Sequence, residues 1–156
     1  MNIIKKLYIL KKYGIFIFYI FFMANFTAKQ LVNYWYKNAQ IKWETAKALK
    51  QSRKYSDCLF FCHLVLECLL KGLVCQKIKK EAPYIHNLIR LAEIAKLELS
   101  AEQKNLLKIV TTFNIRSRYH DYKFRFYKRA TKDFTEKYYQ ECNKIRLWLL
   151  KKLQQS

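Results

Sequence analysis

Glycine and proline are scarce in this chain, which has 2 Gly and 1 Pro among 156 residues. An all-β domain needs frequent turn residues, and a phosphate-binding loop needs clustered glycines, so the composition argues against both. Acidic residues are also few, 11 against 31 Lys and Arg, which gives a net charge of +20. This excess predicts a polyanionic partner, either nucleic acid or an acidic membrane or protein surface. The length fits one domain, and 52 % apolar residues are enough for a buried core, so an all-helical domain is the fold class that remains.

The N-terminal residues 1–22 differ from the rest, with four lysines, no acid and an apolar run from Gly14 to Met23. The run is about half the roughly 20 residues that span a bilayer, and no small-residue cleavage site follows it, so we expect no stable membrane insertion. We favour Met23 over Met1 as the true start and expect the helical domain to occupy residues 23–156. Subtracting the four lysines still leaves that domain a charge of +16. If Met1 is the start, peripheral membrane attachment through this segment is an alternative.

The cysteines form an odd set without a C-x-x-C pair, and four of the five fall in one apolar stretch. They are Cys58, Cys62, Cys68, Cys75 and Cys142. This usage is typical of core residues in a reduced, cytoplasmic protein. A zinc site built from Cys58, Cys62 and His63 is an alternative, but it lacks the usual second pair of ligands. We therefore expect no metal and no cofactor.

Helical periodicity divides the domain into five segments. A capping-box pair, Thr27 and Gln30, precedes the first, and the pair Ser100 and Gln103 precedes the fourth. The apolar spacing predicts helices over about residues 28–49, 56–76, 86–96, 100–113 and 133–153, with a charged loop over residues 77–83. Helices joined by short connections favour antiparallel neighbours, so we predict an all-α, up-and-down bundle of four to five helices.

The densest basic stretch lies between the last two predicted helices and contains one acid, Asp121. Aromatic residues alternate with its cations, an arrangement that suits single-stranded nucleic acid because rings stack on bases while cations neutralise phosphates. The predicted binding residues are Arg118, Tyr119, Lys123, Arg125, Lys128 and Arg129. The alternative is a solvated basic face whose aromatics cover the end of the bundle.

Arg116 and His120 are the candidate catalytic residues in this stretch. Four positions apart, they lie about one turn apart on one face if the fourth helix extends that far. Histidine transfers protons near neutral pH and a guanidinium stabilises an oxyanion, which suits metal-free RNA cleavage by the substrate's own 2′-hydroxyl. The alternative is that Arg118 and Asp121 form structural ion pairs and His120 is an exposed polar residue.

Several short motifs follow one another along the chain at suitable spacing. They are Trp43-Glu44-Thr45-Ala46, Tyr55-Ser56-Asp57-Cys58, Glu67-Cys68-Leu69-Leu70-Lys71, His86-Asn87-Leu88 and Arg116-Ser117-Arg118-Tyr119-His120-Asp121. The third is similar to an E-x-x-L-K segment, the fourth to a His-(Asp/Asn)-Leu turn and the last to an Arg-Tyr-x-Asp segment. Together they resemble the HEPN domain family over most of residues 27–153.

The resemblance implies a four- or five-helix bundle that forms a homodimer and is often encoded beside a minimal nucleotidyltransferase in toxin–antitoxin pairs. In active branches of the family it implies a metal-independent endoribonuclease. The sequence thus predicts a protein that acts on RNA through Arg116 and His120; the alternative is a non-catalytic module that binds nucleotide or nucleic acid or partners a nucleotidyltransferase. Glu67 and Lys71 are expected to form an ion pair on the central helix; the alternative is that they face inward and are buried polar groups that need partners. His86 is expected to cap or pack against the third helix without a catalytic role.

Overall fold

The computed structural model describes residues 26–118 and 126–154, with the backbone alone for residues 115–118. All regular secondary structure in this part is helical, which confirms the predicted all-α bundle. The helices are α2 (Ala28–Gln51), α3 (Tyr55–Ile78), α4 (Leu88–Ile94), α5 (Ala101–Arg118) and α7 (Lys132–Gln154). Residues 126–129 add a further helical stretch before α7.

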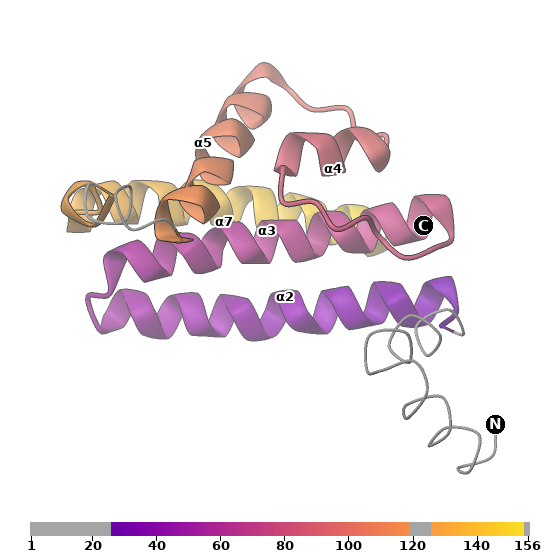
Figure 1. The fold of residues 1–156 in the computed structure, drawn as a ribbon, viewed down its shortest axis with the longest axis horizontal. Coiled ribbons are helices and arrows are strands. Elements are labelled where there is room, and N and C mark those ends of the chain that lie inside the picture. Colours follow the sequence, from indigo (N-terminus) through magenta and orange to yellow (C-terminus); the bar gives the residue numbers. More distant parts are fainter. Residues whose placement is uncertain (1–25, 119–125, 155–156) are drawn as a thin grey trace, which may run out of the picture.

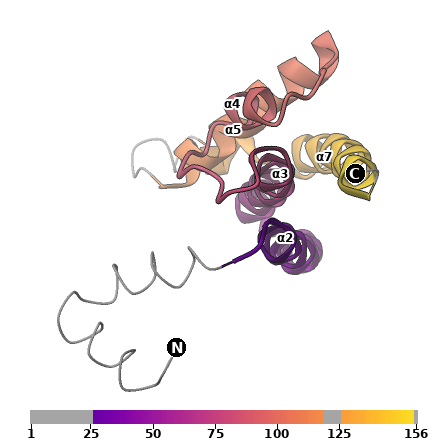
Figure 2. The same ribbon diagram turned by 90° about the vertical axis from the view of Figure 1, so that its right-hand side faces the viewer.

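Helix α3 lies at the centre of the bundle and contacts α2, α4, α5 and α7 (Figures 1 and 2). Helix α2 runs antiparallel to α3, whereas α7 lies alongside α3 in the same direction (Figure 1). Helices α4 and α5 cover the side of α3 opposite α2, and α5 crosses α3 obliquely (Figures 1 and 2). A buried polar side chain on α3 can therefore contact several neighbouring helices at once.

The central position of α3 follows from its sequence, because apolar residues occur all around its circumference. Fifteen of its residues, from Cys58 to Cys75, are buried. Among the described helices, α3 alone is long and apolar enough to cross a membrane, and 83 % of that stretch is buried inside the bundle. The apolar residues around α3 are therefore buried as those of a core helix are.

The two predicted capping boxes are present and set the starts of α2 and α5. The backbone N–H of Gln30 donates to Oγ1 of Thr27 at 3.2 Å, and the backbone N–H of Thr27 donates to Oε1 of Gln30 at 2.8 Å. Ser100 and Gln103 exchange the same two bonds at 3.2 and 2.9 Å. Both pairs satisfy backbone donors that a helix start leaves open, which is why this local signal predicts the boundary correctly.

The third predicted helix, residues 86–96, is shorter in the structure. It begins at Leu88 because Asn87 is the N-cap, with its side chain accepting from the backbone N–H of Arg90. It ends at Ile94, and Lys96 follows in the left-handed region with a φ of 55°. The connection before it consequently covers residues 79–87 and ends later than the predicted loop over 77–83.

Three basic residues take the left-handed conformation in which glycine is usually found. They are Arg53, Lys79 and Lys96, with φ values of 57°, 57° and 55°. Each follows the end of a helix, and the chain has only 2 glycines to offer for such positions. A side chain with a Cβ costs roughly 1–2 kcal/mol in this region, so tight helix ends are formed here at some expense in stability.

Candidate functional site

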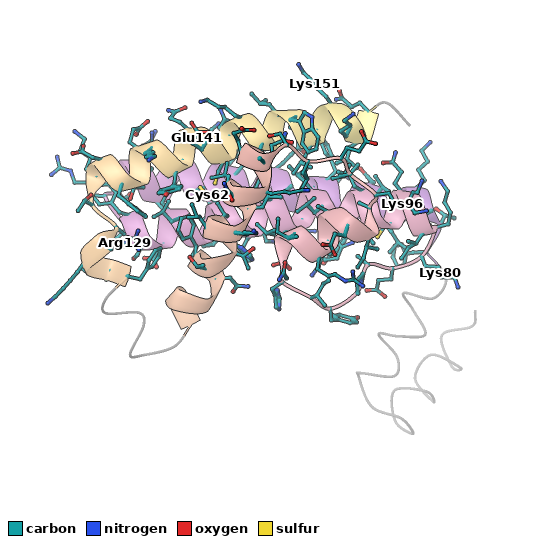
Figure 3. The ribbon with its side chains drawn as sticks, turned by 90° about the horizontal axis from the view of Figure 1, so that it is seen from above. Cys62, Lys80, Lys96, Arg129, Glu141 and Lys151 are labelled. Carbon is teal, nitrogen blue, oxygen red and sulfur yellow. The ribbon has the colours of Figure 1, made fainter. Side chains whose placement is uncertain are left out.

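The predicted nucleic-acid surface lies only partly within the described residues. Arg116 and Arg118 are in the last turn of α5, where only the backbone is described. Four further predicted residues, Tyr119, His120, Lys123 and Arg125, lie outside the described residues. Lys128 and Arg129 lie in the helical stretch 126–129 and are exposed. Figure 3 places Arg129 at one end of the bundle, and Lys80 and Lys96 toward the opposite end.

A buried aromatic cluster connects the two described ends of this basic region. Phe113 of α5 and Phe126 are 1 % and 2 % exposed, and their ring centroids lie 5.4 Å apart. Phe113 also meets the rings of Phe134 and Tyr138 of α7 at 6.3 and 5.6 Å. Arg129 places its guanidinium 5.2 Å from the ring centroid of Phe134. The cluster therefore holds α5, the helical stretch 126–129 and α7 against one another.

A second group of polar side chains surrounds the carboxylate of Glu67 on α3. Nζ of Lys71 donates to Oε1 of Glu67 at 2.7 Å, and Nε2 of His63 lies 3.1 Å from Oε2. Nδ1 of His86 lies 3.0 Å from Oε2 and 3.1 Å from Oε1. We call Glu67, His63, Lys71 and His86 the Glu67 cluster. The expected pair of Glu67 and Lys71 is thus present, within a larger network.

The members of the Glu67 cluster differ in their access to solvent. His63, Glu67 and Lys71 are 0 %, 5 % and 5 % exposed. The side chain of His86 is 50 % exposed. Three charged or polar groups are therefore held inside the bundle, and one imidazole extends from them to the surface.

Burial and hydrogen bonding act on Glu67 in opposite directions. Burial by itself raises the pKa of this carboxyl, but bonds from His63, Lys71 and His86 outweigh burial and lower the pKa to about 2. Glu67 is consequently an ionised, acceptor-only group at neutral pH. The three nitrogens that face it, Nε2 of His63, Nζ of Lys71 and Nδ1 of His86, are therefore the hydrogen-bond donors.

His63 links the cluster to α5. Its Nδ1 lies 3.2 Å from the backbone carbonyl oxygen of Val110, while its Nε2 faces Glu67. Both partners are acceptors, so both bonds form only when both ring nitrogens carry a proton. Because the two bonds occupy both nitrogens and the ring is fully buried, His63 has no nitrogen left for a ligand.

Lys71 is held on its other side by an aromatic ring. Its Nζ lies 5.0 Å from the ring centroid of Trp35 on α2. A cation over the face of an indole ring is stabilised by the ring's electrons, most strongly where water is excluded. The lysine is thus fixed between α2 and the Glu67 carboxylate.

The expectation that His86 caps or packs the third helix requires correction. Asn87 supplies the cap, and the His86 ring reaches back across the connection to Glu67. The spacing of His63, Glu67 and Lys71, four residues apart on one helix, is a signal by which His63 was recognisable as a neighbour of Glu67. Nothing local in the sequence indicates the third partner, 19 residues away.

The five cysteines are free and buried, as predicted for core residues. Burial raises the pKa of the Cys68 thiol to about 11, which disfavours the reactive thiolate. The thiol of Cys62 interacts with those of Cys58 and Cys142, whereas the His63 ring faces Glu67 and the Val110 carbonyl. His63 therefore does not join the two cysteines of the alternative zinc site, and the described residues include no group of three side chains arranged to hold a metal ion.

Comparison with known protein families gives a match over most of the chain. A protein-family model described as HEPN domain matches residues 32–153, which covers most of α2 and nearly all of α7. Neither the curated proteins nor the solved structures contain a match.

Proposed function

This chain belongs to the HEPN domain family, and from that premise we propose that it acts on RNA as a metal-independent endoribonuclease. The proposed catalytic residues are Arg116 and His120. The proposed binding residues are Arg118, Tyr119, Lys123, Arg125, Lys128 and Arg129.

One observation carries the proposal beyond the family: two residues of one buried cluster, Phe113 and Phe126, stand on either side of most of the basic, aromatic-rich region. Phe113 precedes the segment and Phe126 lies within it, and the two rings are in contact. The intervening twelve residues hold four cations and three aromatic rings. A segment of this composition, held at both ends, suits contact with phosphates and unpaired bases.

In the proposed reaction, the 2′-hydroxyl of one nucleotide attacks the adjacent phosphorus and displaces the 5′ oxygen of the next. His120 transfers a proton during this exchange, and the Arg116 guanidinium stabilises the charge that develops on the phosphoryl oxygens. The products are a 2′,3′-cyclic phosphate and a 5′-hydroxyl. These residues supply proton transfer and charge stabilisation without a metal ion.

The proposal includes the setting in which the protein works. We propose that it is a cytoplasmic homodimer whose partner is a nucleotidyltransferase antitoxin encoded beside it. Family resemblance supports this setting, and the charge of +20 supports the polyanionic substrate.

The first test is incubation of the purified protein with total RNA in EDTA, beside the His120→Ala variant, followed by a denaturing gel. We expect discrete fragments with the wild type and a rate lower by at least about 100-fold with His120→Ala, because a positioned proton carrier contributes that much. RNA affinity should change little. Equal cleavage by the two proteins would reject His120 as a catalytic residue.

The second test concerns the binding surface. Arg125→Ala combined with Lys128→Ala should weaken RNA binding and reduce the slope of log affinity against log salt by about one to two units, since each lost phosphate contact releases one counterion fewer. The control is Lys104→Ala with Lys144→Ala, which removes the same charge from exposed positions on α5 and α7. An equal loss in both double variants would show that net charge, and not this surface, governs binding.

A second candidate function is supported by the spacing of the proposed catalytic pair. Arg116 and His120 enclose three residues, fewer than active members of the family have. In this case the chain is a non-catalytic module that binds nucleotide or RNA, or a partner subunit of a nucleotidyltransferase. Intact RNA in both lanes, together with salt-dependent binding, is the result that favours it.

A further inference from the structure

One end of the bundle carries exposed lysines that the proposed function does not use. Helix α2 begins at this end, and α3 and α7 end there (Figure 1). We call Lys29, Lys77, Lys79 and Lys152 the lysine patch; all four are exposed. We propose that the lysine patch binds the surface of a bilayer that contains anionic phospholipids, so that the bundle attaches to a membrane by this end without spanning it.

Surface hollows bring the four lysines together. Lys77, Lys79 and Lys152 line a hollow of about 410 Å³. Lys79 also lines a second hollow, of about 470 Å³, together with Lys29. Side chains from the start of α2, the end of α3 and the end of α7 therefore belong to one continuous surface.

The lysine patch has no counter-charge among the described residues. None of its members forms an ion pair there, whereas four lysines elsewhere in the bundle pair with glutamates. Glu93 lies close in sequence to Ala95, which lines the first hollow, but it pairs with Arg90 at 2.9 Å. Four positive charges are thus left to a partner, and an anionic surface offsets their mutual repulsion.

Helix stability explains only part of this charge. Lys77 and Lys152 lie in the last turns of α3 and α7, where the helix dipole stabilises a cation. Lys29 lies in the first turn of α2, where the dipole disfavours a cation and no acid is present. Lys79 takes the left-handed conformation, which glycine adopts without strain. The helices therefore gain nothing from a lysine at position 29 or 79.

Apolar side chains lie beside the lysine patch. A third hollow, of about 570 Å³, adjoins the second because both are lined by Lys29, Val32 and Leu153. Leu150 also lines the third hollow, and Ile78 at the end of α3 is 38 % exposed. A bilayer surface offers phosphate groups to the lysines and hydrocarbon to such side chains, so it fits both parts of this end.

The composition of the lysine patch favours lipid over RNA. Its cations are all lysines, whereas residues 116–132 hold four arginines and five aromatic rings. Guanidinium groups bind phosphates in a fixed, paired geometry and rings stack on bases, but lysines on flexible stems act as point charges. A fluid layer of anionic headgroups, such as the cytoplasmic leaflet of a membrane, attracts point charges without requiring a fixed geometry.

Co-sedimentation of the full chain with lipid vesicles tests the proposal. The vesicles contain phosphatidylcholine alone or phosphatidylcholine mixed with phosphatidylserine. We expect stronger binding to the mixed vesicles, and this binding should weaken as salt is added because salt screens exposed charges. Equal binding to the two kinds of vesicle would overturn the proposal, since the charge of the lysines would then have no effect.

A charge variant assigns the binding to this end of the bundle. Lys29→Gln combined with Lys77→Gln and Lys152→Gln removes three charges and leaves the backbone at Lys79 unchanged. We expect at least about 10-fold weaker binding to the mixed vesicles, since each lysine near an anionic surface contributes roughly fivefold. The control variant has the same net charge and should bind like the wild type. It replaces three other exposed lysines with glutamine: Lys37, Lys104 and Lys108.

The remaining outcomes each decide against the proposal. Equal losses in the two variants would show that net charge, and not the lysine patch, governs vesicle binding. No loss in either would show that another part of the chain contacts the lipid. If the lysine-patch variant loses RNA affinity as much as it loses vesicle binding, the patch is an RNA surface and the lipid proposal is wrong.

Acetylation of lysines, followed by mass spectrometry, locates the contact without a measurement of affinity. Mixed vesicles should slow the acetylation of Lys77, Lys79 and Lys152 in the wild type and leave Lys104 as reactive as in the free protein. Unchanged reactivity of the lysine patch in the presence of bound vesicles would overturn the proposal. Neither result depends on whether the protein cleaves RNA, so the proposed endoribonuclease activity is tested separately.

Discussion

Glu67→Ala is expected to lower the free energy of unfolding by about 3–5 kcal/mol, because it leaves buried partners without their counter-charge. Lys71 is 5 % exposed and His63 is fully buried, so water cannot replace the lost carboxylate. Lys71 would retain its contact with the Trp35 ring, and His63 its contact with the Val110 carbonyl, but neither contact supplies the missing negative charge. Removal of one member of a buried ionic network therefore costs much more than removal of an exposed pair.

Urea unfolding at neutral pH, followed by circular dichroism, measures this loss. The matched control is Glu44→Ala, which removes an exposed carboxylate that Lys47 of the same helix pairs with at 2.9 Å. Surface pairs of this kind contribute about 0–1 kcal/mol, so the control should unfold almost like the wild type. Similar values for the two variants would show that the Glu67 cluster does not stabilise the bundle.

The lowered pKa of Glu67 also predicts how stability depends on pH. The unfolded chain binds a proton at this carboxyl near the ordinary pKa of 4.5, whereas the folded protein binds it only near a pKa of about 2. Between these values the unfolded state holds more protons, so acid favours unfolding. The contribution of Glu67, about 3 kcal/mol at most, is fully present above pH 4.5 and is lost as the pH falls toward 2. In Glu67→Gln this component of the acid dependence should be missing; an unchanged profile between pH 5 and 3 would contradict the assignment.

Phe126→Ala is expected to cost about 3–5 kcal/mol, the usual loss when a fully buried aromatic side chain is truncated. Phe126 is 2 % exposed and packs on Phe113, which also meets Phe134 and Tyr138. The truncation leaves a cavity where α5, the 126–129 stretch and α7 come together. Because this contact also fixes one end of the basic segment, RNA affinity should fall together with stability.

Tyr127→Ala is the control for this prediction, since it truncates the neighbouring aromatic residue at 68 % exposure. It should change stability by no more than about 0.5 kcal/mol, as exposed substitutions usually do. Urea unfolding and RNA binding at one fixed salt concentration, measured for both variants, separate the roles of the two residues. If Tyr127→Ala proves as destabilising as Phe126→Ala, the buried contact with Phe113 is not what anchors the segment.

The sequence by itself determined the helices and most of the core, because both depend on neighbours within a few residues. The capping boxes at Thr27 and Ser100 set two helix starts, and the apolar spacing predicted the last helix over residues 133–153, which agrees with α7 at Lys132–Gln154. Hydrogen bonds to nearby backbone and a repeat of about 3.6 residues carry that information locally.

Only the tertiary structure decided the Glu67 cluster. His63 and Lys71 are one turn from Glu67, but His86 is 19 residues away and Val110 lies 47 residues from His63. These partners meet because the 79–87 connection returns along α3 and α5 packs across it (Figure 1). These contacts depend on how whole helices pack and on the free-energy cost of leaving a buried charge unpaired. Neither can be predicted from the spacing of residues along one helix.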